Sequence, residues 1–404
     1  MISAAVLIAA VACAGPVTPG SGLDERERAV AGKPRDVQSR LQLADVYLTI
    51  GCPIDAAAQL RTATTLAPRN PGVWYALGQA YNAVKQTALA SFTSASDAPW
   101  RALISADALL ENGHLTDAFA LYHAALESLP SMITIHDSVA RIYERTGHPQ
   151  WAAIERDKIH VDADGCTARR AMCEFRAGRH QAVLDAARGS DTEARYWTAR
   201  AANELALAAF KHLDVLPDSV ERRTVRAARA HAQERYIEEI AELRAAIRLA
   251  GREPHIEYQL ASAYYSARDY DASLAIVLRM LKAFPDESRL MTLKGHLLLQ
   301  LQRPDEAVPI LKDLVLQKPD DSGLRLALAR AYSQTGNYAA AIPLLEEQLD
   351  DDSDGSLHMQ LARAYSALGQ RDKAVPLMAR SEELRKQDEE RRASTAKHVI
   401  TAPK

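Results

Sequence analysis

The chain repeats one arrangement of apolar and small residues at helical spacing. From about Val37 onward, a Leu or Val is followed at once by a small residue and, three residues later, by a Tyr. The clearest copies are Leu43-Ala44-x-x-Tyr47, Leu77-Gly78-x-x-Tyr81, Val139-Ala140-x-x-Tyr143, Leu260-Ala261-x-x-Tyr264, Leu328-Ala329-x-x-Tyr332 and Leu361-Ala362-x-x-Tyr365. Residues four apart lie on one face of a helix, so Leu and Tyr form one apolar stripe. A Gly-containing turn and an Ala-initiated second stretch follow, so the pattern predicts pairs of helices.

Three prolines set the period of this pattern in the last third of the chain. Pro309, Pro343 and Pro376 recur at nearly equal steps, and each lies in the sequence Ala-(Val/Ile)-Pro-(Ile/Leu)-(Leu/Met). A period of about 34 residues in a helix-rich sequence is typical of stacked helix pairs. We expect the prolines in the first turn of the second helices, where an N–H group has no acceptor within the helix. Turn residues such as Gly336 should adopt a positive φ.

The frame consists of a large residue such as Trp74, Leu followed by Gly or Ala, a Tyr, an Ala, and a closing proline such as Pro130. It resembles the tetratricopeptide repeat. The resemblance covers roughly residues 37–386 and implies an all-α, right-handed solenoid of about eleven helix pairs over residues 37–387. Units starting near Val37, Pro71, Ile133, Pro254, Ser288, Ser322 and Gly355 fit closely, with regular repeats over 254–387. Residues 164–190 and 192–251 fit poorly. The chain also resembles a group of secreted bacterial repeat proteins, which implies no particular activity.

Two lengthened repeat pairs suggest a larger internal duplication. Residues 74–130 and 195–251 are segments of equal length that lie far apart in the chain. Tyr75-x3-Gln79-x2-Asn82 in the first matches Tyr196-x3-Arg200-x2-Asn203 in the second.

The family resemblance also implies where a ligand would bind, because the first helix of each pair lines a concave surface in such repeats. The implied peptide-binding groove residues are Tyr75, Gln79, Asn82, Tyr196, Arg200, Asn203, Arg330 and Arg363. Tyr and Arg are enriched in binding hot spots. A chaperone-tail clamp of the kind known in the family needs Lys and Asn where this chain has Leu41 and Asp45, which argues against that clamp. The alternative is that these polar residues are simply solvated.

The N-terminal segment has the character of an export signal. An apolar stretch from Ala4 to Ala14 precedes the first charged residue, Asp24, and is too short to span a bilayer. We expect a signal peptide over residues 1–14 and a flexible linker over 15–36, with a periplasmic or secreted location. Lipidation of Cys13 is a further possibility. The absence of Lys or Arg before the stretch leaves a cytoplasmic protein as the alternative.

The remaining cysteines leave two interpretations open. Cys166 and Cys173 are seven residues apart, and in one continuous helix their Cα atoms would lie about 10.5 Å apart, beyond the reach of a disulfide. They form either a disulfide, with Cys166 outside the helix, or two buried thiols.

The sequence holds no recognisable catalytic or cofactor motif. It lacks a phosphate-binding Gly-x4-Gly-Lys-Ser/Thr loop, a Gly-x-Gly-x-x-Gly sequence, a His-Glu-x-x-His sequence and a Gly-x-Ser-x-Gly elbow, so we expect no enzyme and no cofactor. Asp350-x-Asp352-x-Asp354-Gly355 has the opening spacing of a calcium loop, but its twelfth position is Leu361. We therefore expect a solvated loop there and no metal site.

Composition narrows the class of partner. Of 404 residues, 48% are hydrophobic, which predicts a folded chain, and the net charge of −3 gives no case for nucleic acid. The sequence predicts a protein- or peptide-binding scaffold, in bacterial envelope assembly or secretion if the chain is exported. Alternatives are an adaptor that bridges two partners and a non-catalytic subunit of an enzyme complex. Residues 388–404 should form the end of a charged capping helix and a disordered tail.

Overall fold

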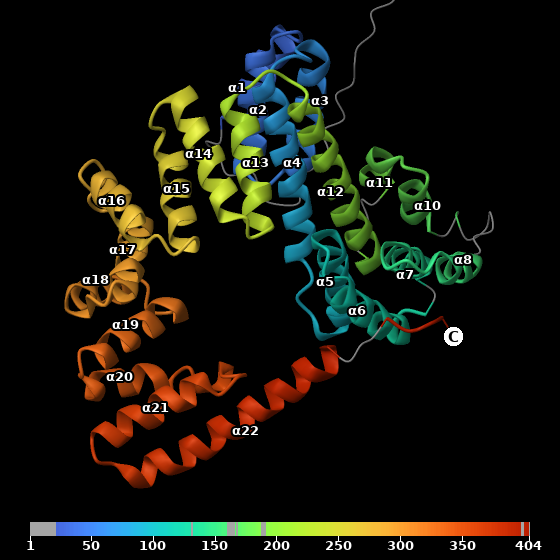
Figure 1. The fold of residues 1–404 in the computed structure, drawn as a ribbon. Coiled ribbons are helices and arrows are strands. Elements are labelled where there is room, and N and C mark those ends of the chain that lie inside the picture. The colour runs from blue at the N-terminus through green and yellow to red at the C-terminus, as the bar shows by residue number, and fades with distance from the viewer. Residues whose placement is uncertain are drawn as a thin grey trace, which may run out of the picture. The chain divides into compact units, whose positions relative to one another are not determined.

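The computed structural model describes residues 22–130, 132–159, 166, 169–186, 191–396 and 400–403. The expected signal peptide and Cys13 lie outside these residues. Throughout the described part of the chain, regular structure is helical and no strand occurs (Figure 1). The chain divides into two compact units: unit 1 comprises Met1–Val225 with Ile400–Lys404, and unit 2 comprises Arg226–Val399.

Unit 1 begins with consecutive antiparallel helices, α1 (Leu23–Gly32), α2 (Val37–Thr49), α3 (Pro53–Leu66) and α4 (Pro71–Ala90). Helix α1 lies within residues 15–36, where we expected a flexible linker. Acidic residues in its first turn favour the helix start, and its Glu27 carboxylate accepts a hydrogen bond from Tyr47 Oη at 2.7 Å. Asn70 caps α4 by accepting from the Gly72 N–H at 2.9 Å.

The rest of unit 1 also consists of helices. These are α5 (Ala98–Asn112), α6 (Leu115–Ser128), α7 (Ile133–Arg145), α8 (Pro149–Asp157), α10 (Arg170–Arg176), α11 (His180–Ala186), α12 (Thr192–Asp214) and α13 (Val220–Ala232), the last of which crosses the unit boundary. The two lengthened segments are alike: each has one long helix, α4 or α12, followed by two shorter ones, α5 and α6 or α13 and α14 (Tyr236–Ala250).

The two long helices of this apparent duplication pack against each other in antiparallel fashion. Trp74 near the start of α4 stacks on His212 near the end of α12, with ring centroids 3.9 Å apart. At the other end, Arg195 at the start of α12 donates to the Ser91 carbonyl beyond the end of α4. Tetratricopeptide-like stacks bury contacts between chain neighbours, so we did not expect a pairing of helices so far apart in the sequence.

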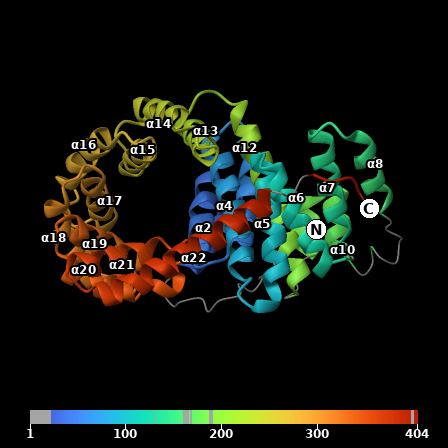
Figure 2. The ribbon, with the colours of Figure 1, turned by 60° about the horizontal axis from the view of Figure 1, so that its bottom comes forward.

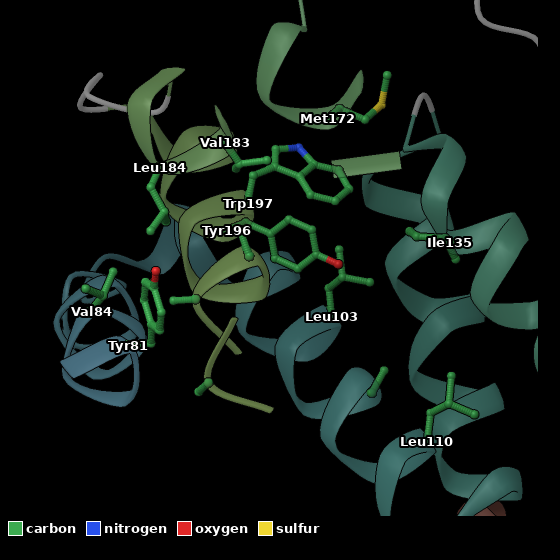
Figure 3. Packing of buried hydrophobic residues seen from close by; sticks show 14 of the residues in the cluster. Tyr81, Val84, Leu103, Leu110, Ile135, Met172, Val183, Leu184, Tyr196 and Trp197 are labelled. Atoms are coloured by element: carbon green, nitrogen blue, oxygen red, sulfur yellow. The ribbon is translucent and has the colours of Figure 1, made fainter. Parts of the chain in front are cut away.

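Unit 1 has a continuous apolar core that α12 organises. Trp197 lies under α10 and α11, close to Met172 and Val183, while the neighbouring Tyr196 ring points toward α5 and Leu103 (Figure 3). Trp197 and Tyr196 are 1% and 0% exposed. Adjacent residues of one helix therefore join two different sets of helices to a single core.

Unit 2 is a regular array in which each helix packs on its neighbours along the chain. After α14 its helices are α15 (Pro254–Ser266), α16 (Tyr270–Leu281), α17 (Ser288–Gln300), α18 (Pro304–Gln317), α19 (Ser322–Gln334), α20 (Tyr338–Glu346), α21 (Ser356–Ala367) and α22 (Arg371–Ala396). Figure 2 shows the succession of these helices from a second direction.

The three periodic prolines lie deeper in their helices than we predicted. Pro309, Pro343 and Pro376 are each the sixth residue of α18, α20 and α22, counted from the starts at Pro304, Tyr338 and Arg371. The prediction of the first turn was therefore wrong. At the sixth position a proline removes one intrahelical hydrogen bond, which makes these helices locally weaker than a proline-free helix.

The C-terminal end also differs from our expectation. Helix α22 continues to Ala396, with Arg385 Nη1 donating to the Glu389 carboxylate at 2.5 Å on its exposed face. The tail beyond it was expected to be disordered, but Ile400–Pro403 lies against unit 1.

The backbone φ angles of the turns show the repeat period more clearly than the residue types at the turns do. Glu234, Arg268, Gln302 and Gly336 follow one another at equal steps of one repeat, and all have positive φ, between 56° and 78°. They occupy equivalent turns between the two helices of each pair. The positive φ predicted for Gly336 is confirmed, and the regular array begins one pair before the expected start at residue 254, with α13 and α14.

Exchanging residues between two of these turns tests the role of this backbone conformation. We expect Gln302→Gly to raise the free energy of unfolding by about 0.5–1 kcal/mol, because a residue with a Cβ is strained at positive φ. Gly336→Ala should lower it by a similar amount, since no atom lies within 4 Å of the added Cβ and only the backbone is affected. Chemical denaturation followed by circular dichroism measures both. Equal midpoints for Gln302→Gly, Gly336→Ala and the unchanged protein would contradict a strained turn.

Candidate functional site

The antiparallel pair α4 and α12 forms a cleft with α5 in unit 1, lined by both apolar and charged side chains. Its charged lining residues are Lys85, Asp107, Glu111, Arg200 and Glu204. Asn203, from the matching Tyr-x3-(Gln/Arg)-x2-Asn motifs, also lines it. Two of the predicted site residues, Arg200 and Asn203, thus lie in one hollow.

A buried network fixes the floor of this cleft. The Asp107 carboxylate accepts hydrogen bonds from Tyr122 Oη at 2.6 Å and from Tyr196 Oη at 2.9 Å. Arg200 Nε lies 3.6 Å from Asp107 Oδ2, and Arg200 Nη1 donates to Tyr196 Oη at 3.1 Å. Burial raises the pKa of both Tyr122 and Tyr196, so both phenols stay protonated and remain donors to the carboxylate. The network is internally satisfied, which marks it as part of the core.

The mouth of the cleft is held by a second set of polar contacts. Lys85 Nζ donates to Asn203 Oδ1 at 3.0 Å, and Asn203 Nδ2 donates to Glu111 Oε1 at 3.3 Å. Desolvation of the Glu111 carboxylate raises its pKa, and the charges of Asp107 and Glu204 act in the same direction. Asn203 therefore links α4 to α5 across the cleft.

These contacts correct our interpretation of Tyr196 as a groove residue. Its side chain is fully buried and cannot contact a partner on an open surface. The Arg200 guanidinium, 16% exposed, lies 4.8 Å from the centre of the Phe175 ring, which adds a cation–π contact to its ion pair. The motif is directed inward because α12 packs on α4 and the helices around them.

The first copy of the motif is less buried. Tyr75 is half-buried beside Leu213, Leu216 and Val225, Asn82 is half-buried, and Gln79 is exposed. The two tyrosines do not share a site, because the antiparallel packing places Tyr75 and Tyr196 at opposite ends of the helix pair.

A different hollow lies on the first helices of four successive repeats in unit 2. It takes residues from α15, α17, α19 and α21. These are Tyr265, His296, Leu299, Gln300, Gly323, Leu326, Ala327, Arg330, Leu357 and Gln360. Its lining combines apolar side chains with a phenol, an imidazole, two side-chain amides and one arginine. Of the predicted site residues, Arg330 lies in this hollow.

Arg330 has an exposed side chain in this hollow. It makes no hydrogen bond or ion pair with any residue that the structure describes. Arg363, one repeat further on, is also exposed and equally unpaired among those residues. Burial lowers the pKa of His296, and the Arg330 charge lowers it further, against a smaller opposite effect of Asp321. At neutral pH the hollow therefore contains one permanent positive charge beside a neutral imidazole.

Comparison with protein families identifies the repeats that carry this hollow. Models of the family described as tetratricopeptide repeat match residues 258–322, 298–357 and 357–392. These repeats are tetratricopeptide repeats. A comparison with curated proteins found no match.

Part of the chain is similar to solved structures of MamA. "MamA MSR-1 C2" is 22% identical with a TM-score of 0.38, and the match covers 42% of this chain and 98% of that one. "MamA AMB-1 C2221" is 24% identical with a TM-score of 0.37 and covers 41% and 98%. "MamA 41-end from Desulfovibrio magneticus RS-1" is 20% identical with a TM-score of 0.39 and covers 42% and 97%.

The acidic run before α21 is occupied by local structure. Asp352 is buried, accepts from the His358 N–H at 2.8 Å, and lies 2.6 Å from His358 Nδ1. Asp354 accepts from the Ser356 N–H at 2.9 Å at the start of α21. Within the described residues no group of three or more potential ligands is arranged for a metal ion. The run therefore initiates a helix in this structure.

Two further features concern the two cysteines and the length of the helices. Cys166 and Cys173 form a disulfide with Cα atoms 5.6 Å apart, and Cys166 lies outside α10, as such a bridge requires. Every helix within the described ranges is too short or too polar to cross a lipid bilayer.

Replacing Tyr196 tests whether the motif on α12 is structural. Tyr196→Ala should lower the free energy of unfolding of unit 1 by about 3–5 kcal/mol, because it leaves a cavity and removes a donor from Asp107. Tyr196→Phe should cost about 1.5–3 kcal/mol, because it keeps the ring and removes only the hydroxyl between Asp107 and Arg200. The matched control, Tyr75→Ala, should cost less than Tyr196→Ala because Tyr75 is only half-buried. Chemical denaturation of the three variants provides the comparison, and an equal loss for both alanine variants would contradict the core role.

Proposed function

We propose that the chain binds an extended protein segment bearing a carboxylate in the hollow of unit 2, as a non-catalytic scaffold. The tetratricopeptide repeats support a role in protein interaction, and the class of ligand is inferred from the hollow itself. The observation that carries the proposal is Arg330, an exposed guanidinium without a protein partner among the described residues, in a hollow that also offers leucine side chains.

The chemistry of the hollow suits such a segment. A guanidinium can bind a carboxylate through two parallel hydrogen bonds, and apolar side chains beside it strengthen that contact by excluding water. Leu326 and Leu357 flank Arg330 in the lining and offer contact area for apolar side chains. Gln360 provides an amide donor and acceptor for a peptide main chain, and Gln300, whose Nε2 donates to Tyr265 Oη at 3.5 Å, provides an amide oxygen as acceptor.

Arg363 extends the positive charge to the next repeat. It has the same position in the Leu-Ala-x-x-Tyr frame as Arg330, one repeat later. We infer that a longer acidic segment contacts both arginines, with Arg330 as the stronger contact because it lies in the hollow. The resulting attraction should weaken as salt is added.

We further propose that the protein is exported and acts in the bacterial envelope. The apolar segment before Asp24 supports export, and so does the disulfide between Cys166 and Cys173, because such bonds persist mainly in oxidising compartments. A scaffold in that location would hold a protein segment during assembly or secretion.

Peptides selected on the unchanged protein from a random library test the proposed ligand class. We expect enrichment of Asp, Glu or a free C-terminal carboxylate. Arg330→Ala should weaken binding of the best selected peptide by about 1–3 kcal/mol, roughly five- to a hundredfold. Lys312→Ala, which removes one charge from the exposed face of α18, is the matched control and should leave affinity unchanged. Selection of peptides without acidic groups, or equal affinities for the two variants, would rule the proposal out.

Export is tested by the mature N-terminus in the native host. Mass spectrometry of protein from a periplasmic or secreted fraction should find a chain that begins near Gly15, or a lipid attached to Cys13. Cysteine alkylation without reductant should leave Cys166 and Cys173 unmodified, and reduction should make both reactive. An intact Met1 together with two free thiols in cytosolic material would contradict the proposal.

A further inference from the structure

The C-terminal residues of the chain lie against unit 1. Tyr143 Oη on α7 donates to the Thr401 main-chain carbonyl at 2.7 Å, and Ile400 packs against the apolar core of unit 1. Figures 1 and 2 both show the end of the chain beside α7. This short segment thus contacts a helix that is remote from it in the sequence.

The surface of α7 is suited to an extended chain segment. Tyr143 is fully buried, and its ring is fixed by Phe119 and Trp151, with ring centroids 5.7 and 5.5 Å away. Burial, and then the Glu155 charge, raise the pKa of Tyr143 to about 12, so its hydroxyl remains a donor at neutral pH. Its contact to a main-chain carbonyl does not depend on the side chain of the bound residue.

The Thr401 carbonyl is the one acceptor that Tyr143 Oη has among the described residues. A buried hydroxyl without a partner is unfavourable, because it has lost its hydrogen bonds to water. Some chain segment, or water that enters in its place, must therefore satisfy this hydroxyl. The occupied state provides both a hydrogen bond and burial of an apolar side chain, which water does not.

The tail has the properties of a ligand for that surface. Ile400 is β-branched and loses little side-chain freedom on burial. Ala402 precedes Pro403, and a residue before proline prefers the extended backbone. Ile400–Pro403 carries no charged side chain, which matches the apolar surroundings of Tyr143.

We propose that this face of α7 is a second peptide-binding site, which the chain's own C-terminal segment occupies as a self-ligand. The site takes an extended peptide with a β-branched apolar residue just before the residue whose carbonyl binds Tyr143. Because the tail is tethered, it acts at an effective concentration in the millimolar range and keeps the site closed to weaker peptides. The site differs from the hollow of unit 2 in position and in ligand chemistry.

A full-length variant that releases the tail tests the proposal. Ile400→Asp should expel the tail, because its carboxylate would be buried in the apolar core. The probe is a fluorescein-labelled peptide with the sequence of residues 397–404, and binding is followed by fluorescence anisotropy. We expect the Ile400→Asp protein to bind it at least tenfold more tightly than the unchanged protein, in which the tail competes. A probe with Asp in place of Ile400 should not bind.

Two further variants assign the contact to Tyr143 and separate it from the unit 2 hollow. Adding Tyr143→Phe to Ile400→Asp should weaken probe binding about fivefold or more, while the ring and the core are retained. Adding Arg330→Ala should leave probe binding unchanged. Circular dichroism checks that each variant keeps its helix content.

Three results would overturn the proposal. The first is equal affinity of the probe for the unchanged and the Ile400→Asp proteins. The second is that the Ile400→Asp protein binds the probe no more tightly than it binds the Asp-containing probe. The third is that Tyr143→Phe leaves the affinity for the probe unchanged.

The tail could instead come from a second copy of the chain. In that case dilution would separate the two copies, and the affinity of the unchanged protein for the probe would rise. The self-ligand interpretation would then be wrong.

Discussion

The antiparallel contact between α4 and α12 is the interaction on which unit 1 depends. It brings together helices that are separated in sequence by α5 to α11, so the intervening helices must leave α4 and return to α12. Close approach requires Gly78, because a Cβ there would lie 2.3 Å from the Phe210 ring. The contact also creates the cleft with α5 and directs Tyr196 into the core. One non-local packing contact therefore sets both the shape of unit 1 and the role of its most conspicuous motif.

The repeats could be predicted from sequence because their causes are local. The Leu-small-x-x-Tyr stripe, the turn and the second helix all lie within one repeat, so each copy carries the same information. Unit 2 follows this rule closely. The turn conformation is more regular than the sequence, since Glu234, Arg268 and Gln302 adopt the positive φ that a glycine adopts at Gly336. The first pair of the array was missed because the residue at its turn gives no sign of that conformation.

The pairing of α4 with α12 could not be predicted in the same way. Both helices carry an apolar stripe that suits any neighbouring helix, and nothing in a single sequence says which partner is chosen. The matching motifs indicated a duplication, but they were interpreted as two copies of one groove site. In the structure Tyr196 and Tyr75 lie at opposite ends of the helix pair, and only Arg330 among the predicted arginines lies in the hollow of unit 2. The position of a residue in the repeat showed which helices line the hollow of unit 2. Which of their polar side chains are accessible depends on burial, which the sequence alone does not give.

The contrast between Arg200 and Arg330 shows what separates a structural from a binding arginine in such repeats. The two residues have equivalent positions on their helices, yet Arg200 has a carboxylate, a phenol and an aromatic ring around it, and Arg330 has no described partner. A buried guanidinium without a counter-charge is strongly unfavourable, so Arg200 must be satisfied within the protein. Arg330 lies in an open hollow where water can solvate it until a carboxylate replaces that water. The same reasoning applies to Tyr143, whose buried hydroxyl needs an acceptor and obtains it from the main chain of Thr401. In this protein, a polar side chain beside apolar residues indicates a ligand site in two cases. Either the protein offers that side chain no partner, as for Arg330, or the partner belongs to a chain segment that can dissociate, as for Tyr143.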